Sequence, residues 1–268
     1  MPVFDGVTGR VYYKAWRGPA PSAATVVFLH GFGEHAGLYH RYGNTLNAAG
    51  IDLWALDEIG HGLTEGERAV IRSVDDLVEN GRRLTAIAEA VQPGTPVWLA
   101  GHSLGTAVAA VSAARDPGRY AGLILSAALL SPLDWVLPMA SDDAAVIDLD
   151  ASDLSSDPFY LDELAFDPLA FTSAAGGRPL ATALSQAWAE MDGFRQVTLP
   201  VLFVHGADDP IVPVADAREW ASRLPRARLA EFAGARHDIL NETVHREVAA
   251  AVTDFILTSG GHPGTAEA

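Results

Sequence analysis

Short apolar runs alternate with helical patterns along most of this chain, and this alternation limits the fold more than any other feature. The runs are apolar almost throughout, as expected of strands covered on both faces. They comprise residues 25–30, 51–56, 97–100, 122–125, 201–204 and 228–232. Apolar residues recur at helical spacing between them, in residues 74–91, 104–115 and 244–256. The pattern predicts an α/β fold, with a mostly parallel central sheet and helices on both faces.

The region from residue 131 to residue 196 interrupts this alternation. It shows no strand pattern, prolines recur in it, and it contributes to a stretch without basic residues between Arg119 and Arg178. Its many aspartates are explained either by a solvated acidic surface or by a helical lid whose charge discourages anionic ligands. We predict a core of residues 1–130 and 197–258, a lid insertion of residues 131–196, and a disordered tail of residues 259–268.

Composition excludes several classes of protein. With 49% hydrophobic residues the chain is not intrinsically disordered. Its 18 basic and 34 acidic side chains give a net charge of −16, which disfavours nucleic acid and anionic membranes as partners. It has no cysteine, so disulfides, thiolate metal sites and a cysteine nucleophile are excluded. Without a visible signal peptide or membrane span, we expect a soluble, cytoplasmic protein.

Residues 101–105 read Gly-His-Ser-Leu-Gly and match the nucleophile-elbow pattern G-x-S-x-G. An expected strand precedes them and a helix of small residues follows. Such a tight turn strains its central residue, and glycines flank it because larger side chains would collide with the neighbouring strand and helix. Ser103 would then stand at a helix N-terminus, where the helix dipole favours negative charge. The motif predicts Ser103 as a nucleophile.

A serine nucleophile needs a base, and the base needs an orienting acid. His237 follows the last expected strand, and Asp208 lies just past the end of another. The chain order Ser103, Asp208, His237 is that of α/β-hydrolases. All three would lie at the carboxyl edge of one sheet, where α/β folds place their sites. We therefore predict these residues as the catalytic triad.

Stabilising an oxyanion requires two backbone N–H groups aimed at one point. Leu104, directly after the nucleophile, supplies the first, and Phe32, in the glycine-flanked loop after the first long strand, the second. Asp57, His30 and His61 also lie at strand ends. We interpret these three as structural residues that shape loops.

Four blocks resemble the monoacylglycerol lipase and lysophospholipase group of serine α/β-hydrolases, sometimes grouped with serine aminopeptidases. The blocks are residues 30–39, 57–66, 101–105 and 234–242, and they keep their order over nearly the whole chain. The resemblance implies the same nucleophile, acid and base, Ser103, Asp208 and His237. It also implies a helical lid about where residues 131–196 lie. No metal or organic cofactor is implied.

The chain departs from these lipases near the expected head-group site. Leu38 stands where an arginine is frequent, and Leu240 where a second histidine occurs. Thr106 replaces the more usual glycine after the elbow. We predict a serine ester hydrolase for neutral acyl esters, such as monoacylglycerols or lysophospholipids, with at most transient membrane or micelle contact through the lid. Two alternatives remain open: an aminopeptidase or amidase that binds an ammonium group with lid carboxylates, and a non-hydrolytic binding protein of the same fold.

Overall fold

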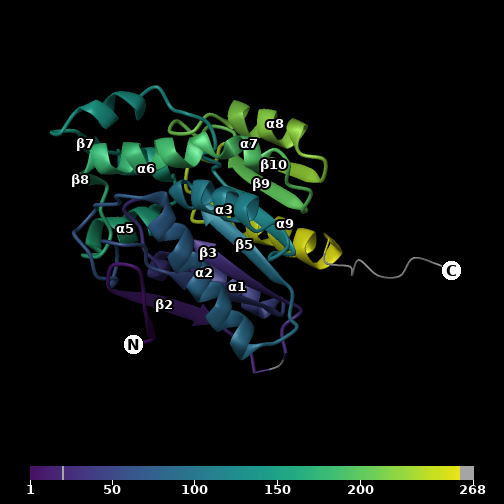
Figure 1. The fold of residues 1–268 in the computed structure, drawn as a ribbon. Coiled ribbons are helices and arrows are strands. Elements are labelled where there is room, and N and C mark those ends of the chain that lie inside the picture. The colour runs from purple at the N-terminus through teal and green to yellow at the C-terminus, as the bar shows by residue number, and fades with distance from the viewer. Residues whose placement is uncertain (20, 260–268) are drawn as a thin grey trace.

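An eight-stranded sheet forms the centre of the computed structural model, which describes residues 1–19 and 21–259 (Figure 1). Its strand order is β1 (Val3–Asp5), β2 (Arg10–Trp16), β4 (Ile51–Leu56), β3 (Ala24–Leu29), β5 (Val97–His102), β6 (Gly122–Ser126), β9 (Val201–Gly206) and β10 (Ala227–Phe232). Strands β1 and β2 run antiparallel to their neighbours. The remaining strands of this sheet, β4, β3, β5, β6, β9 and β10, are parallel to one another. The predicted mostly parallel sheet is confirmed.

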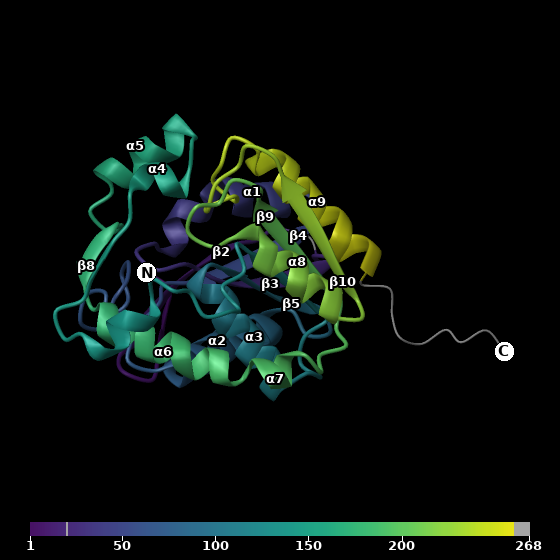
Figure 2. The same cartoon turned by 90° about the horizontal axis from the view of Figure 1, so that it is seen from above.

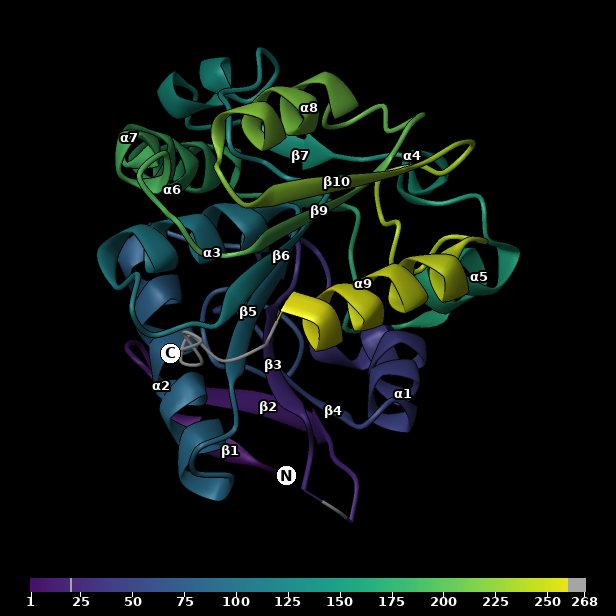
Figure 3. The ribbon, with the colours of Figure 1, turned by 90° about the vertical axis from the view of Figure 1, so that its right-hand side faces the viewer.

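Helices cover both faces of this sheet (Figure 3). One face carries α1 (His40–Ala48) and α9 (His245–Ser259), and the other carries α2 (Val74–Val91), α3 (Leu104–Arg115) and α8 (Val214–Arg223). The helices predicted over residues 74–91 and 104–115 are confirmed. The last helix continues to residue 259, which was predicted to belong to a disordered tail, and the rest of that predicted tail, residues 260–268, lies outside the described residues. No described helix combines the length and the apolar character needed to cross a bilayer.

The inner strands show why their sequence does not alternate. Every residue of β3, β4, β5, β6 and β9 is buried, because helices pack against both of their faces. The edge strand β10 instead mixes exposed and half-buried residues. An almost continuous apolar run is therefore the correct signature of an inner strand in this fold.

Residues 131–196, called the inserted segment below, connect β6 to β9. The segment contains η2 (Leu137–Ser141), β7 (Val146–Asp148), α4 (Ala151–Leu154), α5 (Pro158–Phe166), β8 (Ser173–Ala175), α6 (Gly177–Ala189) and α7 (Met191–Phe194). Figure 2 shows β8 between the α4–α5 corner and α6. The expectation of no strand here is wrong, since β7 and β8 pair antiparallel. Strands of three residues are too short to produce a recognisable alternation.

Helix α3 approaches the sheet so closely that only glycine fits at its start. A Cβ atom on Gly105 would lie 2.0 Å from the carbonyl oxygen of Leu29 in β3. A Cβ on Gly101 would lie 2.3 Å from the backbone carbon of Gly105. These neighbours are backbone atoms, so they cannot rotate away. The predicted reason for the flanking glycines is confirmed.

Replacing Gly105 with alanine is therefore expected to lower the free energy of unfolding by about 2–4 kcal/mol, because β3 and α3 must move apart. Urea denaturation measures this loss. The matched control is Gly118→Ala, whose added Cβ would meet nothing within 4 Å and which should change stability by less than about 0.5 kcal/mol. Equal stability of the two variants would contradict the close approach.

Candidate active site

Ser103 occupies the sharp turn between β5 and α3. Its backbone angles are φ 49° and ψ −117°, and a non-glycine residue in such geometry stores about 1–3 kcal/mol of strain. Hydrogen bonds hold it there: the Ser103 N–H donates to the Ser126 carbonyl at 2.9 Å, and the Thr106 N–H donates to the Ser103 carbonyl at 2.9 Å. The elbow geometry predicted from the motif is confirmed.

Thr106, which departs from the usual glycine, adds a tether to this turn. Its hydroxyl donates to the Ser103 carbonyl at 2.5 Å and accepts the N–H of Leu129 at 2.8 Å. The side chain thus joins the elbow to the loop that follows β6. Both bonds stabilise the strained turn.

His237 receives its acid partner from an unexpected position. Its Nδ1 atom lies 2.9 Å from Oδ2 of Asp209, and both side chains are buried. Asp208 is exposed, so the prediction that it orients His237 is wrong. The cause is the turn after β9, in which Asp209 Oδ1 accepts the N–H groups of Ile211 and Val212 at 2.9 and 3.0 Å. This turn directs Asp209 into the interior and leaves Asp208 in solvent.

The surroundings of Asp209 keep it ionised. Burial alone would raise its pKa, but the charge of His237 and hydrogen bonds from His205 and His237 outweigh burial and hold the pKa far below the usual range. An ionised carboxylate only accepts hydrogen bonds, so His237 must carry its proton on Nδ1. The Nε2 atom of His237 then presents a lone pair, as a general base requires.

One cavity is lined by four of the site residues predicted from the sequence. Ser103, Leu104, Phe32 and His237 all line it, and we call it the Ser103 cavity. Within residues 1–19 and 21–259, neither the Phe32 N–H nor the Leu104 N–H donates to another protein group. Most of the remaining wall is apolar and consists of Leu129, Leu133, Trp135, Val136, Ile147, Leu149, Leu154, Leu180, Leu184, Ile211 and Val212. The cavity is narrow, with a volume of about 40 Å³.

The residues interpreted as structural have backbone partners. His30 is fully buried, with Nδ1 2.7 Å from the Gly31 carbonyl and Nε2 accepting the N–H of Glu58 at 2.8 Å. Asp57 accepts two backbone N–H groups from neighbouring loops, each at 2.8 Å. His61 places Nδ1 2.9 Å from a backbone carbonyl. Their predicted loop-shaping role is confirmed.

The two leucines that replace polar residues of the lipase group lie in the core. Leu38 is 2% exposed and Leu240 is 1% exposed, and both pack in the cluster under α1 and α9. Neither lines the Ser103 cavity. These positions therefore contribute packing to the core of this chain.

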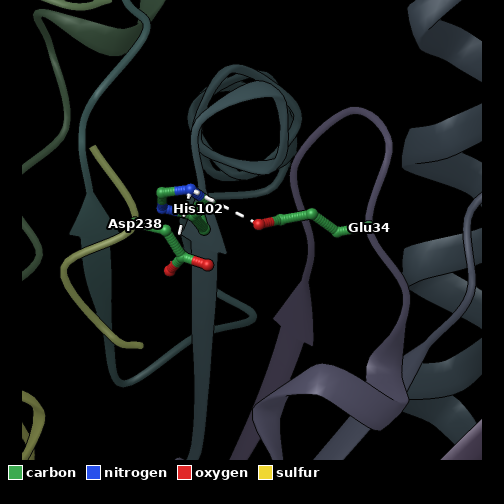
Figure 4. A group of neighbouring side chains, drawn as sticks. All are labelled: Glu34, His102 and Asp238. Atoms are coloured by element: carbon green, nitrogen blue, oxygen red, sulfur yellow. Dashed lines mark ion pairs between the residues drawn. The ribbon is translucent and has the colours of Figure 1, made fainter. Parts of the chain in front are cut away.

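A second buried cluster, which the sequence analysis did not identify as a site, adjoins the triad (Figure 4). It comprises Glu34, His102 and Asp238, and one nitrogen or oxygen from each lies within 4.8 Å of the others. His102 Nε2 is 4.0 Å from Glu34 Oε1 and 4.0 Å from Asp238 Oδ1. We call it the carboxyl cluster. The sequence held one indication of this cluster, because its residues directly neighbour the predicted oxyanion loop, nucleophile and base. Their spacing in the sequence does not reveal that they meet in the fold.

Burial dominates the ionisation of this cluster. It raises the pKa of Glu34 well above the usual range, and the nearby Asp238 charge adds to this shift. Hydrogen bonds from Tyr39 and the Gly31 N–H oppose the shift without cancelling it. Burial also lowers the pKa of His102 to about 4, so this imidazole is neutral at neutral pH. The residue types also suit a metal ion.

Known proteins resemble this chain over most of its length. A family model described as serine aminopeptidase, S33, matches residues 20–244. A monoacylglycerol lipase of Mycolicibacterium smegmatis is 32% identical over 270 residues, covering 95% of this chain and 96% of that protein. Monoglyceride lipase of Homo sapiens is 29% identical over 217 residues, covering 74% and 69%. The crystal structure of Paleococcus ferrophilus monoacylglycerol lipase gives a TM-score of 0.77 at 25% identity, covering 93% of this chain and 99% of that chain.

The two adjacent aspartates make a direct test of the site. Asp209→Asn should slow labelling of Ser103 by a fluorophosphonate by about 10²–10⁴-fold, since an amide cannot hold the Nδ1–H tautomer of His237. Asp208→Asn, the matched control at an exposed position, should label within about threefold of wild type. Labelling rates can be read from gel fluorescence over time. The opposite ranking of the two variants would restore Asp208 as the acid.

Proposed function

Since this chain belongs to the serine aminopeptidase S33 family and is a serine ester hydrolase with the α/β-hydrolase fold, we propose that it cleaves neutral acyl esters such as monoacylglycerols or lysophospholipids. The proposed triad is Ser103, His237 and Asp209. The observation that carries this proposal is the composition of the Ser103 cavity. The strained Ser103, the Asp209-bonded His237 and the N–H groups of Phe32 and Leu104 border one largely apolar cavity.

The proposed reaction uses each of these groups in turn. Ser103 Oγ attacks the ester carbonyl while Nε2 of His237 accepts its proton. The N–H groups of Phe32 and Leu104 donate to the oxyanion of the tetrahedral intermediate, and Asp209 stabilises the imidazolium that forms. His237 then protonates the departing alcohol. Finally it activates a water molecule that releases the fatty acid and regenerates Ser103.

The part of the cavity wall that comes from the inserted segment supports an acyl ester over an amine substrate. None of the aspartates and glutamates of the inserted segment lines the Ser103 cavity as far as the structure describes it. Several of them instead form ion pairs with the core. The pairs are Arg41–Asp157 at 2.7 Å, His35–Asp167 at 2.9 Å and His40–Glu163 at 3.6 Å. An aminopeptidase that binds an ammonium group through these carboxylates would have to break such pairs first.

We assign the inserted segment the role of a lid. Trp135, Val136 and Ile147 come from this segment and close the cavity with apolar side chains. The cavity is narrow in this conformation, so a long acyl chain enters only if the segment moves. Its outer surface exposes Phe159 and Phe166 in α5, at 51% and 85%. These rings suit brief contact with a micelle or a lipid surface, while the net charge of −16 opposes tight docking on anionic lipid.

Release of fatty acid from 1-monolauroylglycerol tests the proposal. Wild type should release laurate, and Ser103→Ala should lose about 10⁴-fold or more, since it lacks the nucleophile. Ser222→Ala, at an exposed serine of α8, is the matched control and should keep full activity. Laurate can be followed by mass spectrometry, with thermal unfolding to confirm that every variant is folded.

Three results would count against the proposal in different ways. Substantial laurate release by Ser103→Ala would remove Ser103 as nucleophile. Hydrolysis of a short p-nitrophenyl ester without laurate release would keep the nucleophile and reject the acylglycerol head group. Cleavage of aminoacyl p-nitroanilides in preference to esters would favour the aminopeptidase alternative.

A further inference from the structure

Glu34 holds the loop that supplies an oxyanion donor. The loop of residues 30–35, called the β3 loop, places the Gly31 N–H 2.8 Å from Glu34 Oε2. The same oxygen accepts the Tyr39 hydroxyl at 2.6 Å, and Glu34 Oε1 accepts the Tyr160 hydroxyl at 3.1 Å. Gly31 packs so close to the nucleophile that an added Cβ would lie 3.2 Å from Cβ of Ser103. A shift of Glu34 therefore shifts the backbone beside the reacting serine.

Asp238 occupies the equivalent place in the loop that carries the base. This loop, residues 233–244, is called the histidine loop, and Asp238 follows His237 directly. Asp238 Oδ2 accepts the Asn241 side-chain amide at 2.9 Å. Its Oδ1 atom is buried and has no hydrogen-bond partner among the described residues. Oδ1 of Asp238 lies 4.0 Å from Nε2 of His102.

Among the residues that the structure describes, the groups around these carboxyls provide no fixed positive charge. The titratable groups that face the cluster are Tyr39 from η1 (Ala36–Tyr39), Tyr160 from α5, His102 from β5 and His237 from the histidine loop. Asp209 and His205 act on the cluster through His102. An oxygen of Glu34 and an oxygen of Asp238 lie within 4.8 Å of each other. Ionising two buried carboxyls at this separation costs much free energy, so the environment favours one bound proton for the pair.

We propose that Glu34 and Asp238 hold one proton between them, directly or across a single water, and that this proton positions the β3 loop and the histidine loop for catalysis. The inference rests on the proposed function, because the loops are argued to carry the oxyanion donor and the base. Both residues are positioning residues: they act through the Gly31–Phe32 backbone and through His237. A pair of carboxyls that shares a proton attracts, whereas a pair that has lost it repels.

A metal ion suits the cluster less well than a proton does. Four-coordinate zinc holds its ligand atoms about 3.4 Å apart, given bond lengths of about 2.1 Å. Here His102 Nε2 is 4.0 Å from each carboxyl group. Both oxygens of Glu34 also accept hydrogen bonds from donors that a cation would displace. The contacts therefore favour a shared proton.

The proposal predicts loss of activity on the alkaline side. The folded pair keeps a proton that a free glutamate releases near pH 4.5, because burial raises the pKa of Glu34. As pH rises through that raised pKa, the pair becomes doubly negative and the two loops separate. Folding stability falls over the same range, since the native state binds a proton that the unfolded state has already lost.

The test compares pH–rate profiles of p-nitrophenyl ester hydrolysis for wild type, Glu34→Gln and Asp238→Asn. Each amide supplies a permanent N–H donor in place of the shared proton. Both variants should therefore shift the alkaline decline upward by about one pH unit or more, or remove it, while the acidic limb stays in place. The shape of the profile is the readout, since a purely structural loss would lower activity at every pH.

Glu58→Gln is the matched control. Glu58 is also buried with its pKa raised, to about 8, but it lies outside the carboxyl cluster and does not line the Ser103 cavity. This variant should keep the alkaline limb of wild type. Profiles of Glu34→Gln and Asp238→Asn that superimpose on wild type would overturn the proposal, as would an equal shift in Glu58→Gln.

A second measurement covers the case in which the amide variants do not fold. In Glu58→Gln, infrared spectroscopy should show a protonated carboxyl band that disappears with rising pH together with activity. Absence of this band at neutral pH overturns the shared proton. If wild type shows no Ser103-dependent hydrolysis, the proposed function fails, while the infrared titration still decides whether the proton exists.

Discussion

The close approach of α3 to β3 is the constraint on which the site depends. Gly101 and Gly105 allow backbone atoms to meet where any side chain would collide. This contact forces the turn at Ser103 into positive φ and brings the end of β3 beside the nucleophile. The N–H groups of Phe32 and Leu104, which come from different loops, then border the same cavity as Ser103. The strain at the serine is sustained by the packing of a helix buried on nearly all sides.

Two buried aspartates near His237 show how the surroundings decide ionisation. Asp209 receives two backbone N–H groups and two imidazoles, and these donors keep it charged despite burial. Asp238 receives one side-chain amide and faces another carboxyl group. The same residue type thus serves as a fixed anion on one side of the imidazole and, in our proposal, as half of a proton-sharing pair on the other. Figure 4 shows how the second pair converges on His102.

The inserted segment and the loops of the sheet contribute different parts of the Ser103 cavity. The proposed triad and oxyanion donors come from loops at the carboxyl edge of the sheet, whereas much of the apolar wall comes from residues 131–196. Ion pairs such as Arg41–Asp157 attach this segment to α1 and its preceding turn. Leu38 and Leu240 are buried in the core and do not line the Ser103 cavity, whereas Glu34 and His102 of the carboxyl cluster do.

Most of the fold and part of the site followed from the sequence alone. Burial on both faces makes inner strands apolar throughout, and helical periodicity located α2 and α3 to the residue. The G-x-S-x-G motif located the elbow because only glycine permits that backbone contact. Adjacent aspartates, however, share one local pattern, and only the turn after β9 selects Asp209 over Asp208. Likewise, Glu34 and Asp238 are far apart in sequence, and only the packing of two loops against β5 brings their carboxyls together. Local patterns specify backbone geometry, whereas side-chain partners depend on how distant segments pack.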